Sequence, residues 1–208
     1  MEAFARCVIV GGAPIDNYER IKNHFKADDF FIYCDSGLKH EEKFDRKADL
    51  IIGDFDSFDR PSRDTEMIVL PRVKDDTDTS FAVKEALKRG FKDFLLVGAS
   101  GARFDHSFVN ISLLLYLKEK GCKAILADDY SVMEMINDRA EVEDKWPFFS
   151  LLAIGGPAKG VNISGSKFPL KNGVITPEDQ YATSNEVTPG ETAAISLSSG
   201  TLLLIKDY

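Results

Sequence analysis

The sequence has 208 residues, of which 44% are hydrophobic and 29% are charged, and its formal net charge is -8 at pH 7. A chain of this length and composition can bury a proper hydrophobic core, so neither a disordered chain nor a membrane protein is indicated. The negative charge repels nucleic acid and anionic lipid, so we expect neither as a partner, and a phosphate-bearing ligand needs a metal ion or a local basic group.

Strands and helices are predicted to alternate over about the first 130 residues. In chain order, we predict a strand at 6–10, a helix at 14–25, a strand at 29–34, a helix at 38–44, strands at 48–52 and 67–70, a helix ending at 89, a strand at 93–97, a helix around 108–117 and a strand at 123–127. This alternation predicts a doubly covered, mainly parallel sheet, which is a Rossmann-like α/β domain. The run from Phe108 to Leu117 is so apolar that we expect it to be sheltered nearly all round, by the core or by a second subunit.

The texture of the sequence changes near residue 139, where helical stripes end. Short apolar runs, separated by Gly, Pro, Asn and Ser, follow at 148–154, 161–163, 193–197 and 202–205. Closely spaced strands with turn signals predict a small antiparallel β-sandwich. We therefore expect an α/β domain over residues 1–138 and a β domain over residues 139–208.

The three cysteines, Cys7, Cys34 and Cys122, lie far apart and form no Cys-x-x-Cys pair. This spacing predicts reduced thiols rather than a disulfide framework or a zinc site. The short apolar run near the N-terminus is interrupted by glycines, so we expect no signal peptide and no membrane span. The expected location is the cytoplasm.

Acidic side chains follow three of the predicted strands: Asp54 and Asp56, then Asp75, Asp76 and Asp78, then Asp105. Because the carboxyl ends of parallel strands meet at one edge of a sheet, the three turns can converge on one pocket. Neighbouring carboxylates repel unless a cation lies between them, and magnesium prefers oxygen ligands. We therefore predict a shared metal and phosphate site, whereas the alternative is three solvated turns or helix caps.

Arg103 lies in a glycine-bracketed loop that opens a predicted helix. Backbone N–H groups and the helix dipole favour anions in this setting, and a guanidinium adds a bidentate clamp for phosphate. The alternative is a surface arginine paired with Asp105. We interpret the neighbouring His106 as a hydrogen-bonded structural residue rather than as a direct participant.

Four stretches, in this order, resemble the motifs of thiamine pyrophosphokinase: Gly-Asp-Phe-Asp-Ser at 53–57, Lys-Asp-Asp-Thr-Asp at 74–78, Gly-Ala-Ser-Gly-Ala-Arg-Phe-Asp-His at 98–106 and Thr-Ser-Asn-Glu at 183–186. The resemblance spans nearly the whole chain and includes the division into two domains. It departs from the family at Ala102, where a second glycine is common, and the single tryptophan, Trp146, is not near the C-terminus.

The resemblance implies transfer of pyrophosphate from ATP to the hydroxyl of thiamine, giving thiamine diphosphate and AMP, with Mg²⁺ and usually in a homodimer. It implies catalytic residues Asp54, Asp56, Asp78, Arg103 and Asp105, of which Asp54, Asp56 and Asp78 hold Mg²⁺. It implies ATP contacts from Lys74, Asp75, Thr77, Asp78, Arg103 and Asp105, and thiamine contacts from Ser184 and Asn185. Residues 1–138 become the catalytic domain, and residues 139–208 become the thiamine-binding and dimerisation domain.

Two other functions remain open from the residues alone. Asp54-Phe55-Asp56 also matches the metal-binding motif of a nucleotide-sugar glycosyltransferase, although that hypothesis leaves the turns at 74–78 and 98–106 unexplained. The chain could instead be a regulatory protein that senses a nucleotide without catalysis. Formation of AMP from ATP on addition of thiamine and Mg²⁺ separates the first hypothesis from both others.

Overall fold

The computed structural model describes residues 6–55, 62–71 and 75–208. It divides into two compact units, unit 1 (Met1–Asp129) and unit 2 (Tyr130–Tyr208). The division precedes the boundary that the sequence suggested after residue 138, because the strand β7 (Ser131–Ile136) pairs along its length with the C-terminal strand β13 (Leu202–Asp207).

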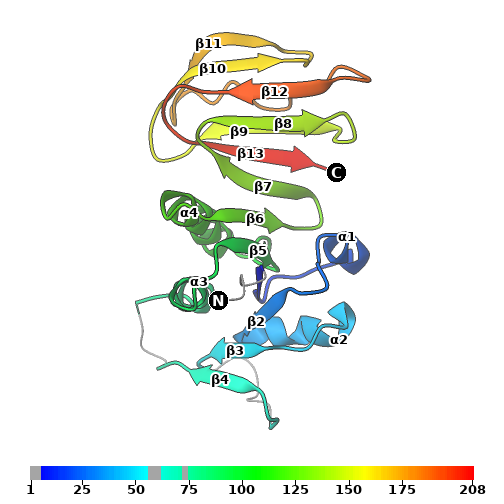
Figure 1. The fold of residues 1–208 in the computed structure, drawn as a ribbon, viewed down its shortest axis with the longest axis vertical. Helices are drawn as coiled ribbons and strands as arrows, with labels where there is room; N and C mark the ends of the chain where they lie inside the picture. The colour runs from blue at the N-terminus through cyan, green and yellow to red at the C-terminus, as the bar shows by residue number, and fades with distance from the viewer. Residues whose placement is uncertain (1–5, 56–61, 72–74) are drawn as a thin grey trace. The chain divides into compact units, whose positions relative to one another are not determined.

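Unit 1 is built on six parallel strands in the spatial order β4-β3-β2-β1-β5-β6 (Figure 1). Their bounds are β1 (Cys7–Val10), β2 (Phe30–Cys34), β3 (Leu50–Gly53), β4 (Glu66–Val69), β5 (Asp93–Val97) and β6 (Lys123–Ala127). The strand β1 pairs with β2 on one side and with β5 on the other, so the strand order reverses at the β1–β5 pair. In open α/β sheets, a ligand crevice forms outside the carboxyl ends of the strands at such a reversal.

The strands β1 and β3 are completely buried, as expected for parallel strands covered on both faces. The described helices of unit 1 are α1 (Tyr18–Lys22), the 3-10 helix η1 (Asp35–His40), α2 (Glu41–Phe44), α3 (Asp78–Lys88) and α4 (Phe104–Glu119). The predicted parallel α/β fold is confirmed, although α1 ends before Phe25 and α4 begins earlier than the apolar run indicated.

The sequence predicted that the apolar run of α4 is sheltered nearly all round, either by the core or by a second subunit. The core of this chain does not shelter it in that way. Its buried residues are Asn110, Leu113, Leu114 and Leu117. Phe104 and Phe108 are 82% and 54% exposed, and their ring centroids lie 6.3 Å apart. Shelter from a second subunit stays a prediction.

Unit 2 is an antiparallel β structure, as the sequence predicted. Its other strands are β8 (Arg139–Glu143), β9 (Phe148–Ala153), β10 (Ala158–Ser164), β11 (Leu170–Ile175) and β12 (Thr192–Ser196). One sheet contains β7-β13-β9, and a second has the order β11-β10-β12-β8. Side chains of both sheets, such as Phe149, Leu204, Val161 and Ile195, share one buried cluster, which makes the two sheets a sandwich.

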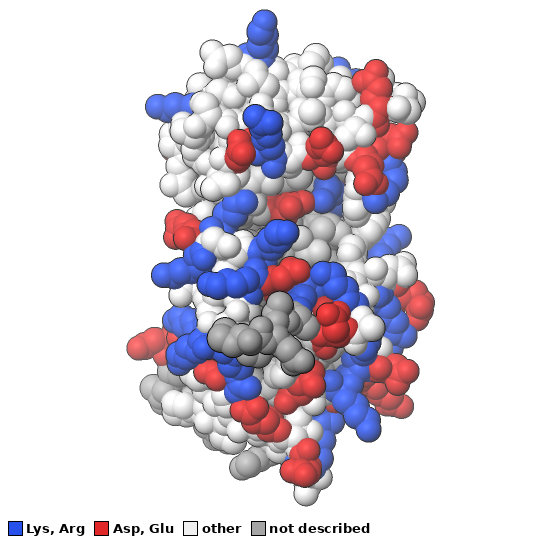
Figure 2. Space-filling view, in the orientation of Figure 1, with Lys and Arg blue, Asp and Glu red and all other residues white. Residues whose placement is uncertain are grey.

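Charged side chains of both signs are mixed on one face of the surface (Figure 2). Figure 2 shows Lys and Arg interspersed with Asp and Glu on the face that it draws, rather than separated by sign. Within the residues that the structure describes, the helices all lack the combination of length and apolar character that crossing a membrane requires.

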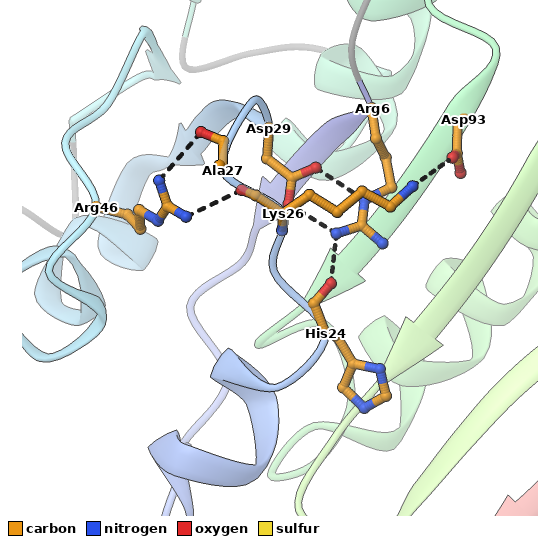
Figure 3. Close-up of polar contacts among 7 residues, drawn as sticks. All are labelled: Arg6, His24, Lys26, Ala27, Asp29, Arg46 and Asp93. Carbon is orange, nitrogen blue, oxygen red and sulfur yellow. Dashed lines mark hydrogen bonds and ion pairs between the residues drawn. The ribbon is translucent and has the colours of Figure 1, made fainter.

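A buried ion pair joins the N-terminal ends of β1 and β2 (Figure 3). Arg6 Nε and Nη2 donate to the two carboxylate oxygens of Asp29 at 3.0 and 2.7 Å, and Nη2 also donates to the carbonyl of His24. The backbone N–H of Lys26 donates to Asp29 at 2.7 Å. A buried pair with this many hydrogen bonds is costly to break from one side, because the remaining charge stays in the interior.

We therefore expect Asp29→Asn to lower the free energy of unfolding by about 3–5 kcal/mol, measured by urea denaturation. Asp93, which meets Lys26 at 3.3 Å across an exposed pair, provides the matched control. Asp93→Asn is expected to cost no more than about 1 kcal/mol. Equal costs for the two substitutions would contradict the special role of the buried pair.

His40 is a second buried polar residue that supports the fold, and its ring contacts two segments. Its Nε2 lies 2.9 Å from the carbonyl oxygen of Ala13, and its Nδ1 lies 2.6 Å from the hydroxyl of Tyr18. Since a carbonyl only accepts, Nε2 carries the proton, and a neutral ring then accepts from Tyr18 through Nδ1. Burial lowers the pKa of His40 from 6.5 to about 4.

The unfolded chain takes up this proton at a higher pH than the folded chain does. The stability that His40 contributes is thus fully present above pH 6.5 and is lost as the pH falls toward 4. Unfolding free energies of the wild type and of His40→Gln, measured across this range, should converge on acidification. Parallel curves would show that His40 does not titrate in this way.

Candidate active site

Residues from five segments line a cavity of about 450 Å³ in unit 1. They are Gly11–Pro14 after β1, Cys34–Ser36 after β2, Asp54 after β3, Thr77–Thr79 at the start of α3, and Gly98, Ala99, Gly101, Ala102, Arg103, His106 and Asn110 after β5. The cavity therefore lies at the carboxyl ends of the strands, where the order of the sheet reverses. Its volume is in the range of sites that take small molecules.

Three carboxylates converge in this cavity: Asp35, Asp54 and Asp78 offer oxygens that all lie within 4.8 Å of one another. Asp54 and Asp78 were predicted to meet at one edge of the sheet, and the structure brings them together. Asp35 was missed as a ligand, although its position directly after the apolar run of β2 was a usable signal. Asp56, which was predicted beside Asp54, lies outside the described residues.

The approach of Asp35 to Asp54 depends on the glycine that precedes Asp54. In the parallel register of β2 and β3, Cys34 is the partner of Ile52, so the next residues, Asp35 and Gly53, lie side by side. A Cβ on Gly53 would lie 3.0 Å from the Cβ of Asp35 and 3.1 Å from its Cα. Glycine at 53 thus leaves the space in which the buried Asp35 stands.

Asp78 is brought to the cluster by the first turn of α3. Thr77 caps this helix, because its hydroxyl oxygen accepts a hydrogen bond from the backbone N–H of Ser80 at 3.1 Å. The positive end of the helix dipole then lies beside the carboxylate of Asp78. Of the other residues predicted in this turn, Asp75 is exposed, and Lys74 lies outside the described residues.

The donor set suits a hard divalent cation. Carboxylate oxygens are the donors that Mg²⁺ and Ca²⁺ prefer, whereas soft or borderline metals select sulfur and imidazole. Three carboxylates at this spacing also repel one another, and a cation between them relieves that repulsion. Asp35, Asp54 and Asp78 therefore fit a magnesium site.

Two glycine-containing loops, at residues 11–14 and 98–103, form another wall of the cavity. They are joined back to back, since Gly11 N donates to Val97 O and Ala13 N donates to Gly98 O, both at 2.9 Å. A Cβ on Gly11 would meet the carbonyl oxygen of Gly98 at 2.5 Å, so the loops can approach this closely only without a side chain there.

Ala102 is the position at which the chain departs from the family motif, and the structure gives the reason that glycine suits it. Ala102 has a φ of 51°, in the left-handed region that glycine adopts without strain. The loop keeps this conformation with alanine, directly before Arg103.

Arg103 lines the cavity together with the acidic cluster, as predicted, and it also makes the surface pair that was the alternative. Its Nε and Nη2 lie 3.2 and 2.6 Å from the carboxylate oxygens of Asp105. The hydrogen bonds from Arg103 hold the pKa of Asp105 below its ordinary value. Because both side chains are about two-thirds exposed, at 67% and 65%, water screens the pair and a phosphate can compete for the guanidinium.

His106 and Asn110 lie in α4, the helix that begins directly after Arg103, and neither was assigned a ligand role from the sequence. His106 is exposed and lines the cavity, and its structural role stays a prediction. Asn110 is 6% exposed, and its Nδ2 donates to Ala99 O at 2.6 Å, which fixes the second glycine loop onto α4.

Ser184 and Asn185, the residues expected to contact thiamine, belong to unit 2. Ser184 is exposed and has a φ of 54°. Asn185 is buried, its Nδ2 donates to Phe168 O at 2.8 Å, and its Oδ1 accepts from the N–H groups of Phe168 and Glu186. The amide of Asn185 therefore braces its own loop.

Two family models and several known proteins match this chain. The family model described as "Thiamin pyrophosphokinase, catalytic domain" matches residues 21–126, and "Thiamin pyrophosphokinase, vitamin B1 binding domain" matches residues 137–202. A thiamine pyrophosphokinase of Bacillus subtilis is 26% identical over 163 residues, which cover 74% of this chain and 76% of the relative. Thiamin pyrophosphokinase 1 of Caenorhabditis elegans is 22% identical over 93% of this chain and 86% of its own.

Solved structures show the same fold. The crystal structure of the Bacillus subtilis thiamine pyrophosphokinase superposes with a TM-score of 0.86 at 22% identity, over 98% of this chain and 99% of that one. Yeast thiamin pyrophosphokinase gives a TM-score of 0.77 at 15% identity, over 100% and 88% of the two chains. Since the two family models together span most of the sequence, the chain belongs to the thiamin pyrophosphokinase family.

Proposed function

We propose that the cavity of unit 1 binds ATP and that the chain transfers its pyrophosphoryl group to the hydroxyl of thiamine, giving thiamine diphosphate and AMP. The observation that carries this proposal is the convergence of Asp35, Asp54 and Asp78 in one cavity with Arg103. Family membership supports the choice of substrates. Phosphoryl transfer needs mostly positioning and stabilisation of charge, which this set of side chains can provide.

Asp35, Asp54 and Asp78 hold Mg²⁺, together with Asp56, which follows Asp54 by two positions in the sequence. Bound Mg²⁺ neutralises charge on the polyphosphate that a protein of net charge -8 would otherwise repel. Asp35 is the buried member of the set and Asp54 and Asp78 are partly exposed, so the open side of the cluster is the side of the cavity.

Arg103 exchanges Asp105 for phosphate oxygens when ATP binds. Its planar guanidinium can form two parallel hydrogen bonds to phosphate, as it now does to the carboxylate. Asp105 holds the arginine in reach of the cavity beforehand. Lys74, Asp75 and Thr77 extend the ATP site along the turn before α3, in which Thr77 acts mainly through its cap.

The reaction joins the hydroxyl oxygen of thiamine to the β-phosphorus of ATP. It breaks the bond from the β-phosphorus to the oxygen that bridges it to the α-phosphorus, and this oxygen leaves with AMP. The hydroxyl proton passes to a carboxylate at the rim, for which Asp78 and Asp105 are the candidates. Ser184 contacts thiamine through its exposed hydroxyl, while Asn185 shapes the loop that presents it.

The proposed homodimer and the proposed cytoplasmic location are supported by exposed aromatic side chains and by the cysteines. The exposed aromatic pair Phe104 and Phe108 supports a homodimer, since large apolar side chains side by side favour burial against a partner. The three cysteines are free and buried, which supports a reducing compartment, the cytoplasm.

Loss of a single metal ligand is expected to abolish turnover without unfolding the chain. Asp54→Asn and Asp78→Asn should each lower thiamine-dependent AMP formation by about 100-fold or more, because charge stabilisation at the phosphate is lost. Asp76, whose carboxylate is bound to Lys84 at 2.7 Å, lies two residues before Asp78 and is the matched control.

Asp76→Asn should remain near the wild-type rate, and circular dichroism should show all three variants folded. If Asp54→Asn and Asp78→Asn both kept near wild-type activity, the metal role of the cluster would be excluded. A wild type in which thiamine does not increase AMP formation would exclude transfer to thiamine.

The phosphate clamp is tested separately by steady-state kinetics with ATP varied. Arg103→Lys keeps the charge but loses the fork, so kcat/KM for ATP should fall by about tenfold, and Arg103→Gln should lower it further. Arg139, an 85% exposed arginine of unit 2 that pairs with Asp138, is the control. An Arg103→Gln variant no worse than Arg139→Gln would rule out the clamp.

A further inference from the structure

Two consecutive carboxylates, Asp128 and Asp129, follow the end of β6 and hold the two glycine loops of the cavity. Neither residue lines the cavity, and neither stood out in the sequence. Each one bonds to a different loop, more than twenty residues away in the chain. Both loops belong to the wall in which the proposed ATP site lies.

Both carboxylate oxygens of Asp129 accept hydrogen bonds from residues 16 and 17, in the segment between β1 and α1. Oδ2 accepts from the backbone N–H of Asp16 at 2.9 Å, and Oδ1 accepts from that of Asn17 at 2.8 Å. Arg20 returns the contact, since its Nη1 donates to the carbonyl oxygen of Asp129 at 2.5 Å. The end of β6 is thus bonded to the residues just beyond Pro14, which itself lines the cavity.

Asp128 holds the loop that follows β5. Its Oδ2 accepts from the hydroxyl of Ser100 at 2.6 Å. Ser100 lies between Ala99 and Gly101, which both line the cavity, and it comes three residues before Arg103. A hydrogen bond to an ionised acceptor is among the stronger kinds, so this contact limits where the loop can go.

The two contacts complement the bonds that already join the loops to each other. Gly11 and Ala13 bond the loops at their inner ends, next to the strands. Asp128 holds the outer part of the second loop, and Asp129 holds residues 16 and 17, which continue the chain just beyond the first loop, so both segments are fixed to the end of β6. Glycine-rich segments have many conformations to lose on binding, and fixing them beforehand removes that cost from the binding of a ligand.

We propose that Asp128 and Asp129 are positioning residues for ATP, which keep the two glycine loops at the spacing that its phosphates require. The proposal rests on the proposed function, because it takes the cavity to be the ATP site. It assigns a role in nucleotide affinity to residues that do not touch the nucleotide. A purely structural role would instead lower stability and leave the ATP parameters unchanged.

The test compares Asp128→Asn, Asp129→Asn and Ser100→Ala with the wild type. Ser100→Ala removes the donor to Asp128 without altering either acid, and is the smallest change. Asp144→Asn is the matched control, because Asp144 also accepts from an exposed backbone N–H, that of Gly190 at 2.8 Å, but in unit 2. Binding of ATP with Mg²⁺ is measured by calorimetry, and KM values for ATP and thiamine by kinetics.

We expect ATP to bind roughly 10-fold to 100-fold more weakly to the Asp129→Asn variant, as for other misplaced binding groups. Asp128→Asn and Ser100→Ala should share a smaller loss, while the KM for thiamine stays as in the wild type. Asp144→Asn should match the wild type in both affinities. Thermal unfolding ensures that the comparison is made where every variant is folded.

Unchanged ATP affinity in folded Asp129→Asn and Ser100→Ala would overturn the positioning role while leaving the proposed function intact. A wild type that binds ATP with Mg²⁺ but forms no AMP with thiamine would overturn the proposed function, and the calorimetric comparison would still decide the role of Asp129. A wild type that binds no ATP would overturn both.

Discussion

The close approach of β2 and β3 at their carboxyl ends is the constraint on which the site depends. Their register sets Asp35 beside Gly53, where a Cβ would lie 3.0 Å from the Cβ of Asp35 and would require Asp35 to shift. Asp54 then follows directly, and α3 brings Asp78 to the same place. The ends of β2 and β3 and the first turn of α3 thus hold three carboxylates together, so the folded chain itself supplies an arrangement that a cation completes.

The two glycine-containing loops of the cavity, at residues 11–14 and 98–103, also depend on close backbone packing. The glycines at 11 and 98 let two loops pack backbone to backbone, and Arg103 stands at the end of the second loop. The acidic cluster and these loops belong to one cavity, as the reversal of strand order at β1 and β5 requires. The strand order, rather than the net charge of the chain, thus brings the acidic cluster and Arg103 into the same cavity.

The sequence was sufficient for the alternation of strands and helices, because buried parallel strands are short continuous apolar runs. It was also sufficient for the convergence of Asp54 and Asp78, which follows from where strands end. Asp35 also follows the end of a strand, but its closeness to Asp54 depends on the pairing of β2 with β3, which is not local. The fit of Asp128 and Asp129 to loops more than twenty residues away is non-local in the same way.

Unit 2 shows where pattern reasoning falls short. The strands β7, β8 and β11 were not predicted, because charged and glycine residues interrupt their apolar alternation, and the structure divides the chain before β7 rather than after it. Asn185 illustrates a different limit. A motif can mark it as a family residue, but only the structure reveals that its amide braces the loop around Ser184.

The central claim is that Asp35, Asp54 and Asp78 bind a divalent ion that also contacts the phosphates of ATP. Its most direct test is anomalous diffraction from crystals grown with Mn²⁺ and a non-hydrolysable ATP analogue. We predict an anomalous peak at about 2.0–2.4 Å from oxygens of these three carboxylates, in contact with the analogue. An analogue ordered in the cavity with its metal peak away from all three aspartates would contradict the claim.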